Sequence, residues 1–163
     1  MRKLTLTTIA AVVATVTCLT GLLGVGQASA APIAQLTTTG NDFGTFGNHS
    51  FCRGSVHIGL QAPARKPGVV RVTATSHGFT GDGTSWKRTP RCKVVFRTIF
   101  TSARGYLLHH WTPASFGPRP GEKRTWDVHT GSGVVSFTVN TTHAKGELIN
   151  QQSAGFGAFL AVP

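Results

Sequence analysis

Acidic residues are scarce in this chain of 163 residues, which contains only five Asp and Glu in total. They are Asp42, Asp82, Glu122, Asp127 and Glu147. Each lies in or beside a turn signal or on the polar face of an expected strand, so no clear carboxyl pair is offered for glycoside hydrolysis. A glycine-rich loop of the P-loop type is also missing. These absences argue against enzyme function without excluding it, and the composition indicates no cofactor.

Histidine and cysteine lack the spacing of a closed metal site. The seven histidines are His49, His57, His77, His109, His110, His129 and His143. Neighbouring side chains on a strand point to opposite faces, so His109 and His110 cannot bind one ion while the backbone is extended. If the mature chain begins at Ala31, it also lacks the N-terminal histidine of a copper oxygenase. We therefore expect no metal site.

A long apolar run occurs only at the start of the chain. Residues 1–3 are Met-Arg-Lys, residues 4–25 are largely apolar, and residues 28–30 are Ala-Ser-Ala, a small-residue cleavage signal. We expect residues 1–30 to be a secretory signal peptide of bacterial type, cleaved after Ala30 to leave 133 residues. A membrane anchor is the alternative, because the run approaches the ~20 residues that span a bilayer. Cys18 lacks a lipobox before it and is expected to leave with the signal.

Only two cysteines, Cys52 and Cys92, remain once the signal peptide is removed. Exported proteins fold in an oxidising environment, so we expect these two residues to form a disulfide. Closing a loop of about 41 residues would stabilise the fold by roughly 4 kcal/mol in the chain-entropy description. A redox-active pair is normally closely spaced, so a structural role is expected. The same reasoning predicts a secreted or cell-surface-associated protein.

Positive charge, in contrast to negative charge, is plentiful. Without Arg2 and Lys3 the mature chain keeps 14 Lys and Arg against five Asp and Glu, which gives a formal net charge of +9. Such a field attracts polyanions and anionic surfaces. Many exported proteins are basic without a specific ligand, so the charge alone assigns no function.

The segment Cys92–Thr101 gives the best strand signal in the chain. Every second residue from Cys92 to Phe100 belongs to one face of Cys, Val, Phe, Thr and Phe. The opposite face begins at Lys93, includes Arg97, and mixes cationic with β-branched side chains. The first face is therefore predicted to be core, and the second to be a partly covered outer face.

Alternation and turn signals predict further strands. They span Phe51–Leu60, Val69–His77, Tyr106–Trp111, Leu148–Gln152 and Gly155–Val162. Residues 112–121 are expected to form a loop, and no helix is required up to residue 124. Residues 31–50 are expected to form a loose N-terminal arm with at most one short strand. With about seven to nine strands, residues 51–163 predict an all-β fold: a single antiparallel β-sandwich, immunoglobulin-like in architecture, with one disulfide.

Residues 124–141 are predicted to form a hairpin with Gly131 and Ser132 as its two-residue turn. The register pairs Trp126 with Phe137, Asp127 with Ser136, Val128 with Val135 and His129 with Val134. The large apolar residues then share one face, and Asp127, His129 and Ser136 share the other. These three are the residue types of a nucleophilic hydrolase and are the catalytic candidates. On the solvent face of a flat ribbon, without a nucleophile elbow, they also fit an ordinary polar surface.

Four basic residues, which are the candidate binding residues, fall on the outward side of their expected strands. They are Arg53, Arg71, Lys93 and Arg97, with His57 and His77 on the same side. If these strands share one sheet, they form a cationic face for an anionic cell-wall polymer, a membrane surface or nucleic acid. The alternative is a solvated face distributed over two sheets.

The functional expectation is therefore a small, exported, non-catalytic binding or cell-surface-associated module that contacts anionic envelope polymers. A small secreted hydrolase that uses Asp127, His129 and Ser136 is one alternative. A secreted effector or structural protein that binds another protein is a second alternative. The sequence predicts no oligomeric state.

Overall fold

The computed structural model describes residues 30–37, 39–145 and 148–163. The expected signal peptide lies outside these residues, apart from Ala30. The described elements are β1 (Ala31–Pro32), β2 (Ala34–Thr37), β3 (Asp42–Phe46), β4 (Arg53–Ala62), β5 (Val69–Thr80), α1 (Gly83–Arg88), β6 (Cys92–Thr101), β7 (Leu107–Phe116), β8 (Lys123–His129), β9 (Gly133–Lys145), β10 (Leu148–Gln151) and β11 (Phe156–Val162). Strands therefore dominate the described chain, as the sequence predicts.

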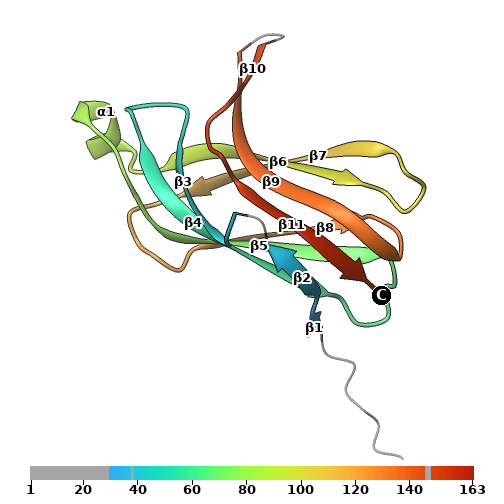
Figure 1. Cartoon of the computed structure of the whole chain (residues 1–163). Coiled ribbons are helices and arrows are strands. Elements are labelled where there is room, and N and C mark those ends of the chain that lie inside the picture. Colours follow the sequence, from blue (N-terminus) through green and yellow to red (C-terminus); the bar gives the residue numbers. More distant parts are fainter. Residues whose placement is uncertain (1–29, 38, 146–147) are drawn as a thin grey trace, which may run out of the picture.

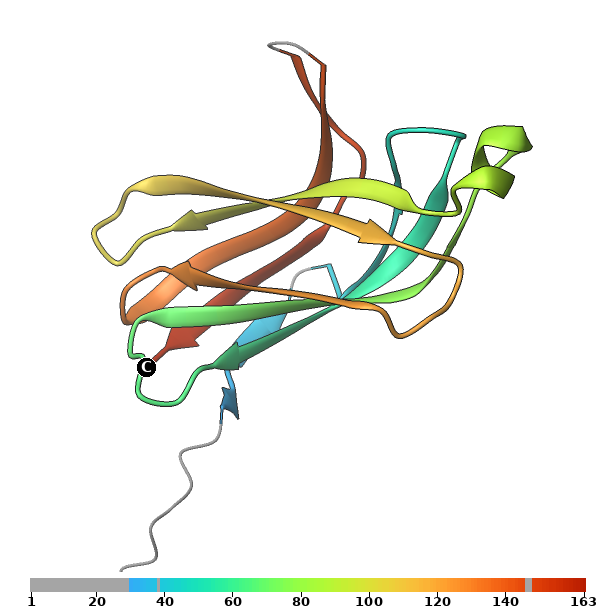
Figure 2. The same cartoon turned by 180° about the vertical axis from the view of Figure 1, so that it is seen from behind.

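Two antiparallel sheets pack against each other as the layers of a sandwich (Figures 1 and 2). The first sheet has the strand order β1-β4-β5-β8, and β3 also pairs with β4. The second sheet has the order β2-β11-β9-β6-β7, and β10 also pairs with β9. The prediction of an antiparallel β-sandwich with one disulfide is confirmed.

The central strand β6 has the predicted bounds and the predicted alternation of buried and outward residues. Its Phe96 is fully buried and stacks on Trp126 of β8, with 5.2 Å between the ring centres. Phe116 of β7 meets Phe96 edge-on at 6.1 Å. The Trp126 indole N–H donates to Thr98 Oγ1 at 3.1 Å. Because Trp126 belongs to the first sheet, these contacts join the two layers at the centre of the core.

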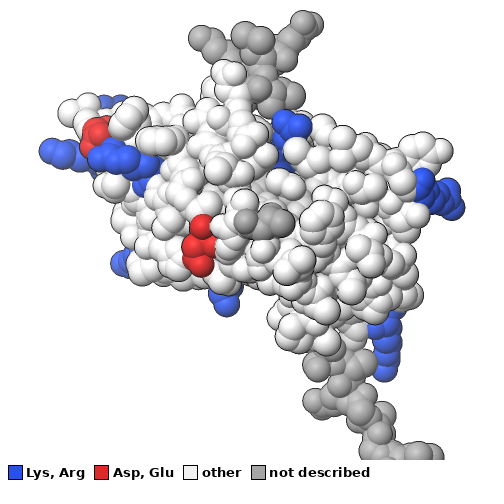
Figure 3. Space-filling model, viewed as in Figure 1, with Lys and Arg blue, Asp and Glu red and all other residues white. Residues whose placement is uncertain are grey.

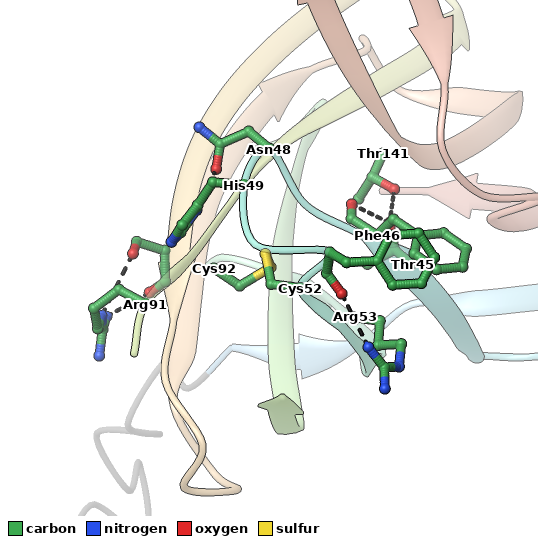
Figure 4. Close-up of a disulfide and its surroundings, with 11 residues drawn as sticks. Thr45, Phe46, Asn48, His49, Cys52, Arg53, Arg91, Cys92 and Thr141 are labelled. Carbon is green, nitrogen blue, oxygen red and sulfur yellow. Dashed lines mark hydrogen bonds between the residues drawn. A yellow bond between two sulfur atoms is a disulfide. The ribbon is translucent and has the colours of Figure 1, made fainter. Parts of the chain in front are cut away.

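The predicted disulfide is present and links the two sheets (Figure 4). Cys52 lies just before β4 and Cys92 begins β6, and their Cα atoms are 5.7 Å apart. The loop of residues 47–51 packs over the bond, since the Gly47 N–H donates to the Cys52 carbonyl at 2.8 Å. A Cβ atom at Gly47 would lie 2.6 Å from Cys52 Sγ, so glycine is needed for this close approach.

The predicted hairpin of residues 124–141 is wrong, because its two strands belong to different sheets. β8 pairs with β5, whereas β9 pairs with β6, β10 and β11. The turn between them crosses from one layer to the other, and Thr130 N–H donates to the Gly68 carbonyl at 3.0 Å. Trp126 and Phe137 are both buried, as predicted. Strands that face one core from opposite layers show the same alternation as sheet neighbours, so the pattern alone cannot separate them.

Short elements account for the remaining differences. The N-terminal arm forms three short strands rather than at most one, and β2 and β3 pair with β11 and β4. β7 continues to Phe116 through part of the expected loop, and Pro113 is tolerated because β7 is an edge strand. The helix α1, which buries Trp86, is too short to show a helical period. Within the described part of the chain, no helical segment has the length and hydropathy of a membrane span.

Candidate functional site

The four predicted binding residues lie on two different sheets. Arg53 on β4 and Arg71 on β5 face outward from the first sheet, whereas Lys93 and Arg97 on β6 face outward from the second. In Figure 3, Lys and Arg side chains occupy several separate places on the face viewed. The hypothesis of one cationic face on one sheet is therefore wrong, and the distributed alternative applies.

The two basic residues of the first sheet are already paired with carboxylates. Arg71 donates from Nε to Asp127 Oδ1 at 2.7 Å and from Nη2 to Oδ2 at 2.9 Å, and Lys66 Nζ donates to Oδ2 at 3.3 Å. The hydrogen bond from Arg71, more than that from Lys66, holds the pKa of Asp127 below its ordinary value. Arg53 Nη1 lies 2.9 Å from Asp82 Oδ2. Each of these arginines therefore already has a carboxylate partner in the folded protein.

Asp127→Asn should lower the free energy of unfolding at pH 7 by about 1 kcal/mol, because the two-point carboxylate partner of Arg71 is lost. The lowered pKa of Asp127 means that the ion pair stabilises the fold above the ordinary aspartate pKa. This stabilisation disappears as the pH falls through the folded-state value. In urea unfolding, the difference between wild type and Asp127→Asn should therefore shrink on acidification.

Asp82→Asn is the matched control for this prediction. The Asp82 side chain is 62% exposed, whereas that of Asp127 is 23% exposed. Exposed ion pairs contribute little to stability, so the control should change the free energy of unfolding only slightly. Equal losses in the two variants would contradict a specific role for Asp127.

The carboxylate of Asp42 is shared by two histidines, a cluster that the sequence analysis missed. His77 Nε2 lies 2.8 Å from Asp42 Oδ1, and His57 Nδ1 lies 3.1 Å from Oδ2. These hydrogen bonds lower the pKa of Asp42. The three side chains are exposed, whereas acid–base catalysis normally uses a concave pocket. The cluster links side chains of β3, β4 and β5 on the outer face of the first sheet.

The adjacent residues His109 and His110 do not form a metal site together. His109 and His110 pair with Ile99 and Thr98, so they point to opposite faces of β7 as expected for a strand. In the described ranges, no group of three or more His, Cys, Asp or Glu is arranged to hold a metal ion.

The three catalytic candidates are not brought together. Asp127 and His129 belong to β8 in the first sheet, whereas Ser136 belongs to β9 in the second. Asp127 binds Arg71 rather than a histidine, and Ser136 is exposed opposite Phe159 of β11. A hydrolytic triad needs its nucleophile, base and orienting acid within mutual hydrogen-bonding reach. The predicted arrangement of these residues does not exist in the fold.

A groove at the rim of the sandwich collects three basic side chains, and we call it the basic groove. It is lined by Lys93 of β6, Lys123 and Arg124 of β8, Asn48, Val94, Val95 and residues 113–116 of β7. Its volume is about 590 Å³. Arg124 reaches it from the core side of β8, since it pairs with the buried Ala74. β8 and β7 are the edge strands of their sheets, so the basic groove lies between the two layers.

The basic groove keeps its positive charge. The adjacent carboxylate, Glu122, is bound by Arg91 Nη1 at 2.8 Å and accepts the Gly117 N–H at 3.1 Å. Arg91, seen beside the disulfide in Figure 4, also donates to the Ser115 carbonyl at 2.6 Å. For the side chains that the structure describes, the three basic residues of the groove take part in none of the ion pairs. They are therefore available to an anionic ligand.

Unpartnered polar atoms lie beside the basic groove on the outer face of β6. The Arg97 guanidinium lies 5.6 Å from the ring centre of Trp111, on the same face as Lys93. Arg97 on β6 is paired in register with Asn140 on β9. Three buried atoms on this face have no hydrogen-bond partner among the described residues: Arg97 Nε, Asn140 Oδ1 and Thr142 Oγ1. These atoms have almost no accessible surface, and Asn140 and Thr142 are buried as whole residues, so they are not open to a ligand.

Lys123 and Arg124 were not predicted as partners of Lys93. The pair is visible in the sequence as two adjacent basic residues, but only the meeting of the β7 and β8 edges brings them to β6.

The chain matches no known protein-family model, and no curated protein or solved structure shows significant similarity to it. Its function is therefore argued from the site itself.

Proposed function

We propose that the mature protein is a small exported, non-catalytic binding module that contacts an anionic polymer of the cell envelope through the basic groove. The observation that carries this proposal is the groove itself, whose lining includes three basic residues outside the ion pairs of the described structure, while the adjacent carboxylate is bound by Arg91. A disulfide between the layers accords with an oxidising extracellular compartment.

The polymer class follows from the chemistry around the groove. Lys93, Lys123 and Arg124 attract phosphate or carboxylate groups, and this attraction is screened by salt because the side chains are exposed. A polymer that carries phosphate or carboxylate groups along its chain therefore fits the groove.

Lys93→Glu combined with Arg124→Glu should weaken binding to lipid-free cell-wall material by about tenfold or more. Each exposed charge contact contributes about 0.2–1 kcal/mol, and the double variant replaces two attractions by two repulsions. The assay is co-sedimentation of the purified mature protein with the wall material at low and high salt. Wild-type binding should fall strongly at high salt.

Arg65→Glu combined with Arg104→Glu is the control of equal charge change. Both residues lie in turns at the other end of the sandwich, after β4 and β6. On lipid-free material this control should retain most of the wild-type binding. Equal loss in the two double variants would show that net charge rather than the groove governs binding, and no wild-type binding at either salt would overturn the proposal.

A further inference from the structure

The turn between β6 and β7 displays three consecutive large apolar side chains to solvent. Tyr106 is 66% exposed, Leu107 66% and Leu108 44%. Elsewhere in the described ranges, exposed large apolar residues are not consecutive in the sequence. The turn lies at one end of the sandwich (Figures 1 and 2). Contiguous exposed apolar residues on a folded domain mark an interaction surface.

Leu107 and Leu108 point to opposite sides of this hairpin. Leu107 pairs with Thr101 on the outer face of the second sheet, whereas Leu108 pairs with Phe100 on the core-facing side. A flat protein partner would cover one side of the hairpin and leave the other side in water. A lipid bilayer surrounds an inserted tip on all sides, so this pair of leucines favours a bilayer.

Four backbone N–H groups in the turn have hydrogen-bond partners. The Ser102 N–H donates to the Tyr106 carbonyl at 2.8 Å, and the Gly105 N–H donates to the Ser102 carbonyl at 2.8 Å. The Tyr106 N–H donates to the Ser102 hydroxyl at 3.2 Å, and the Ala103 N–H donates to the Thr130 carbonyl at 2.9 Å. Unpaired backbone groups resist transfer into lipid, so this turn enters the headgroup region at low cost.

Positive charge lies within the turn and beside Trp111. Arg104 is exposed in the same turn, and the Arg97 guanidinium on the outer face of β6 lies 5.6 Å from the ring centre of Trp111. Basic side chains close to a membrane are attracted by anionic headgroups. Trp111, which is 39% exposed, lies on the same outer face as Leu107, four residues further along β7. Tyr and Trp side chains favour the membrane–water interface, which fits Tyr106 and Trp111.

We propose that this hairpin tip docks the protein peripherally on a bilayer that contains anionic lipids. Tyr106, Leu107 and Leu108 enter the boundary between headgroups and acyl chains, and Arg104 contacts the anionic headgroups. This surface is separate from the basic groove, which lies beside the first residues of β6 rather than beside its end. The inference therefore does not depend on the proposed function.

The test measures co-sedimentation of the purified mature protein with vesicles of phosphatidylcholine, with and without phosphatidylglycerol. Wild type should bind the anionic vesicles more tightly. Leu107→Ser combined with Leu108→Ser should lower this binding by about tenfold or more, since two apolar side chains lose their burial in lipid. This variant keeps the net charge, so the loss cannot come from weaker long-range attraction. Arg104→Glu should weaken binding to the anionic vesicles and leave binding to neutral vesicles unchanged.

Phe46→Ser combined with Phe51→Ser is the matched control. These aromatic residues are 45% and 69% exposed and lie beside the start of β4, away from the tip. Their loss should leave vesicle binding intact. Unchanged vesicle binding of the double leucine variant, or absence of wild-type binding to anionic vesicles, would overturn the inference.

A comparison of the two assays separates this inference from the proposed function. The double leucine variant should lose vesicle binding and keep binding to lipid-free wall material. Lys93→Glu combined with Arg124→Glu should lose wall binding and retain more vesicle binding than the double leucine variant does. The opposite ranking on vesicles would place the membrane contact at the basic groove and refute the role of the tip.

Discussion

Replacing Cys52 and Cys92 together by alanine should lower the free energy of unfolding by roughly 4 kcal/mol, because the cross-link restricts the unfolded chain. The two residues are separated by 40 positions in the sequence, which makes the closed loop long. Domains of this kind have a total stability of about 5–15 kcal/mol, so the change removes about a quarter of it or more. This is one of the two largest effects expected from changes in this protein.

The position of the disulfide gives it a second effect in the folded state. It joins the starts of β4 and β6, and therefore the two layers, at the end of the sandwich that carries the basic groove. The Asn48 N–H, from the loop that covers the disulfide, donates to the Lys93 carbonyl at 3.1 Å. Both of these residues line the basic groove. Loss of the disulfide should thus loosen one wall of the groove as well as destabilise the fold.

Urea unfolding of wild type and of the double alanine variant, each with and without reductant, measures this effect. Reductant should lower the midpoint of the wild type and leave that of the variant unchanged. The free energies follow from the midpoints and slopes of the transitions. A wild-type midpoint that does not respond to reductant, under conditions where free thiols appear, would contradict the stabilising role.

Strand positions were the part of the fold that alternation could predict. In β6 the side chains alternate between core and surface over all ten residues, so both its bounds and its buried face follow from the sequence. β10 and β11 were also located, within one residue at each end. The disulfide followed from the predicted signal peptide and the cysteine count. These features depend on local pattern or on simple counting, which a single sequence contains.

Strand pairing could not be predicted in the same way. Trp126 and Phe137 are both buried, as their alternation indicates, but they approach the core from opposite layers. The predicted register therefore joined two strands that never pair, and the shared face of Asp127 and Ser136 disappeared with it. Alternation gives the direction of a side chain relative to the core, and sheet membership depends on contacts between distant segments.

The candidate site was only half predictable for the same reason. Lys93 and Arg97 were placed on an outer face by alternation along one strand, and they lie there. Lys123 and Arg124 reach Lys93 only because the edges of β7 and β8 meet at the rim of the sandwich. The neutralisation of Arg71 by Asp127 likewise depends on the pairing of β5 with β8. Each of these contacts requires strand order, which the sequence does not provide.

Phe96→Ala is expected to lower the free energy of unfolding by about 3–5 kcal/mol, comparable to the loss of the disulfide. The Phe96 side chain is completely buried, and its removal leaves a cavity between the two sheets. The ring also loses its stacking on Trp126 and its edge contact with Phe116, at 5.2 Å and 6.1 Å between ring centres. Such aromatic pairs add about 0.5–1.5 kcal/mol beyond the burial of apolar area.

Val95→Ala, on the neighbouring position of β6, is the control that separates burial from strand propensity. Val95 faces outward and is only partly covered, so its replacement should cost about 1 kcal/mol or less. Urea unfolding followed by tryptophan fluorescence measures both variants, and Phe96→Ala should also change the native emission because Trp126 loses its stacking partner. Similar losses in the two variants would mean that β6 does not present Phe96 to a close-packed core. A much larger loss in Phe96→Ala would show that burial of this ring between the two sheets, rather than strand propensity, accounts for the stability that this position contributes.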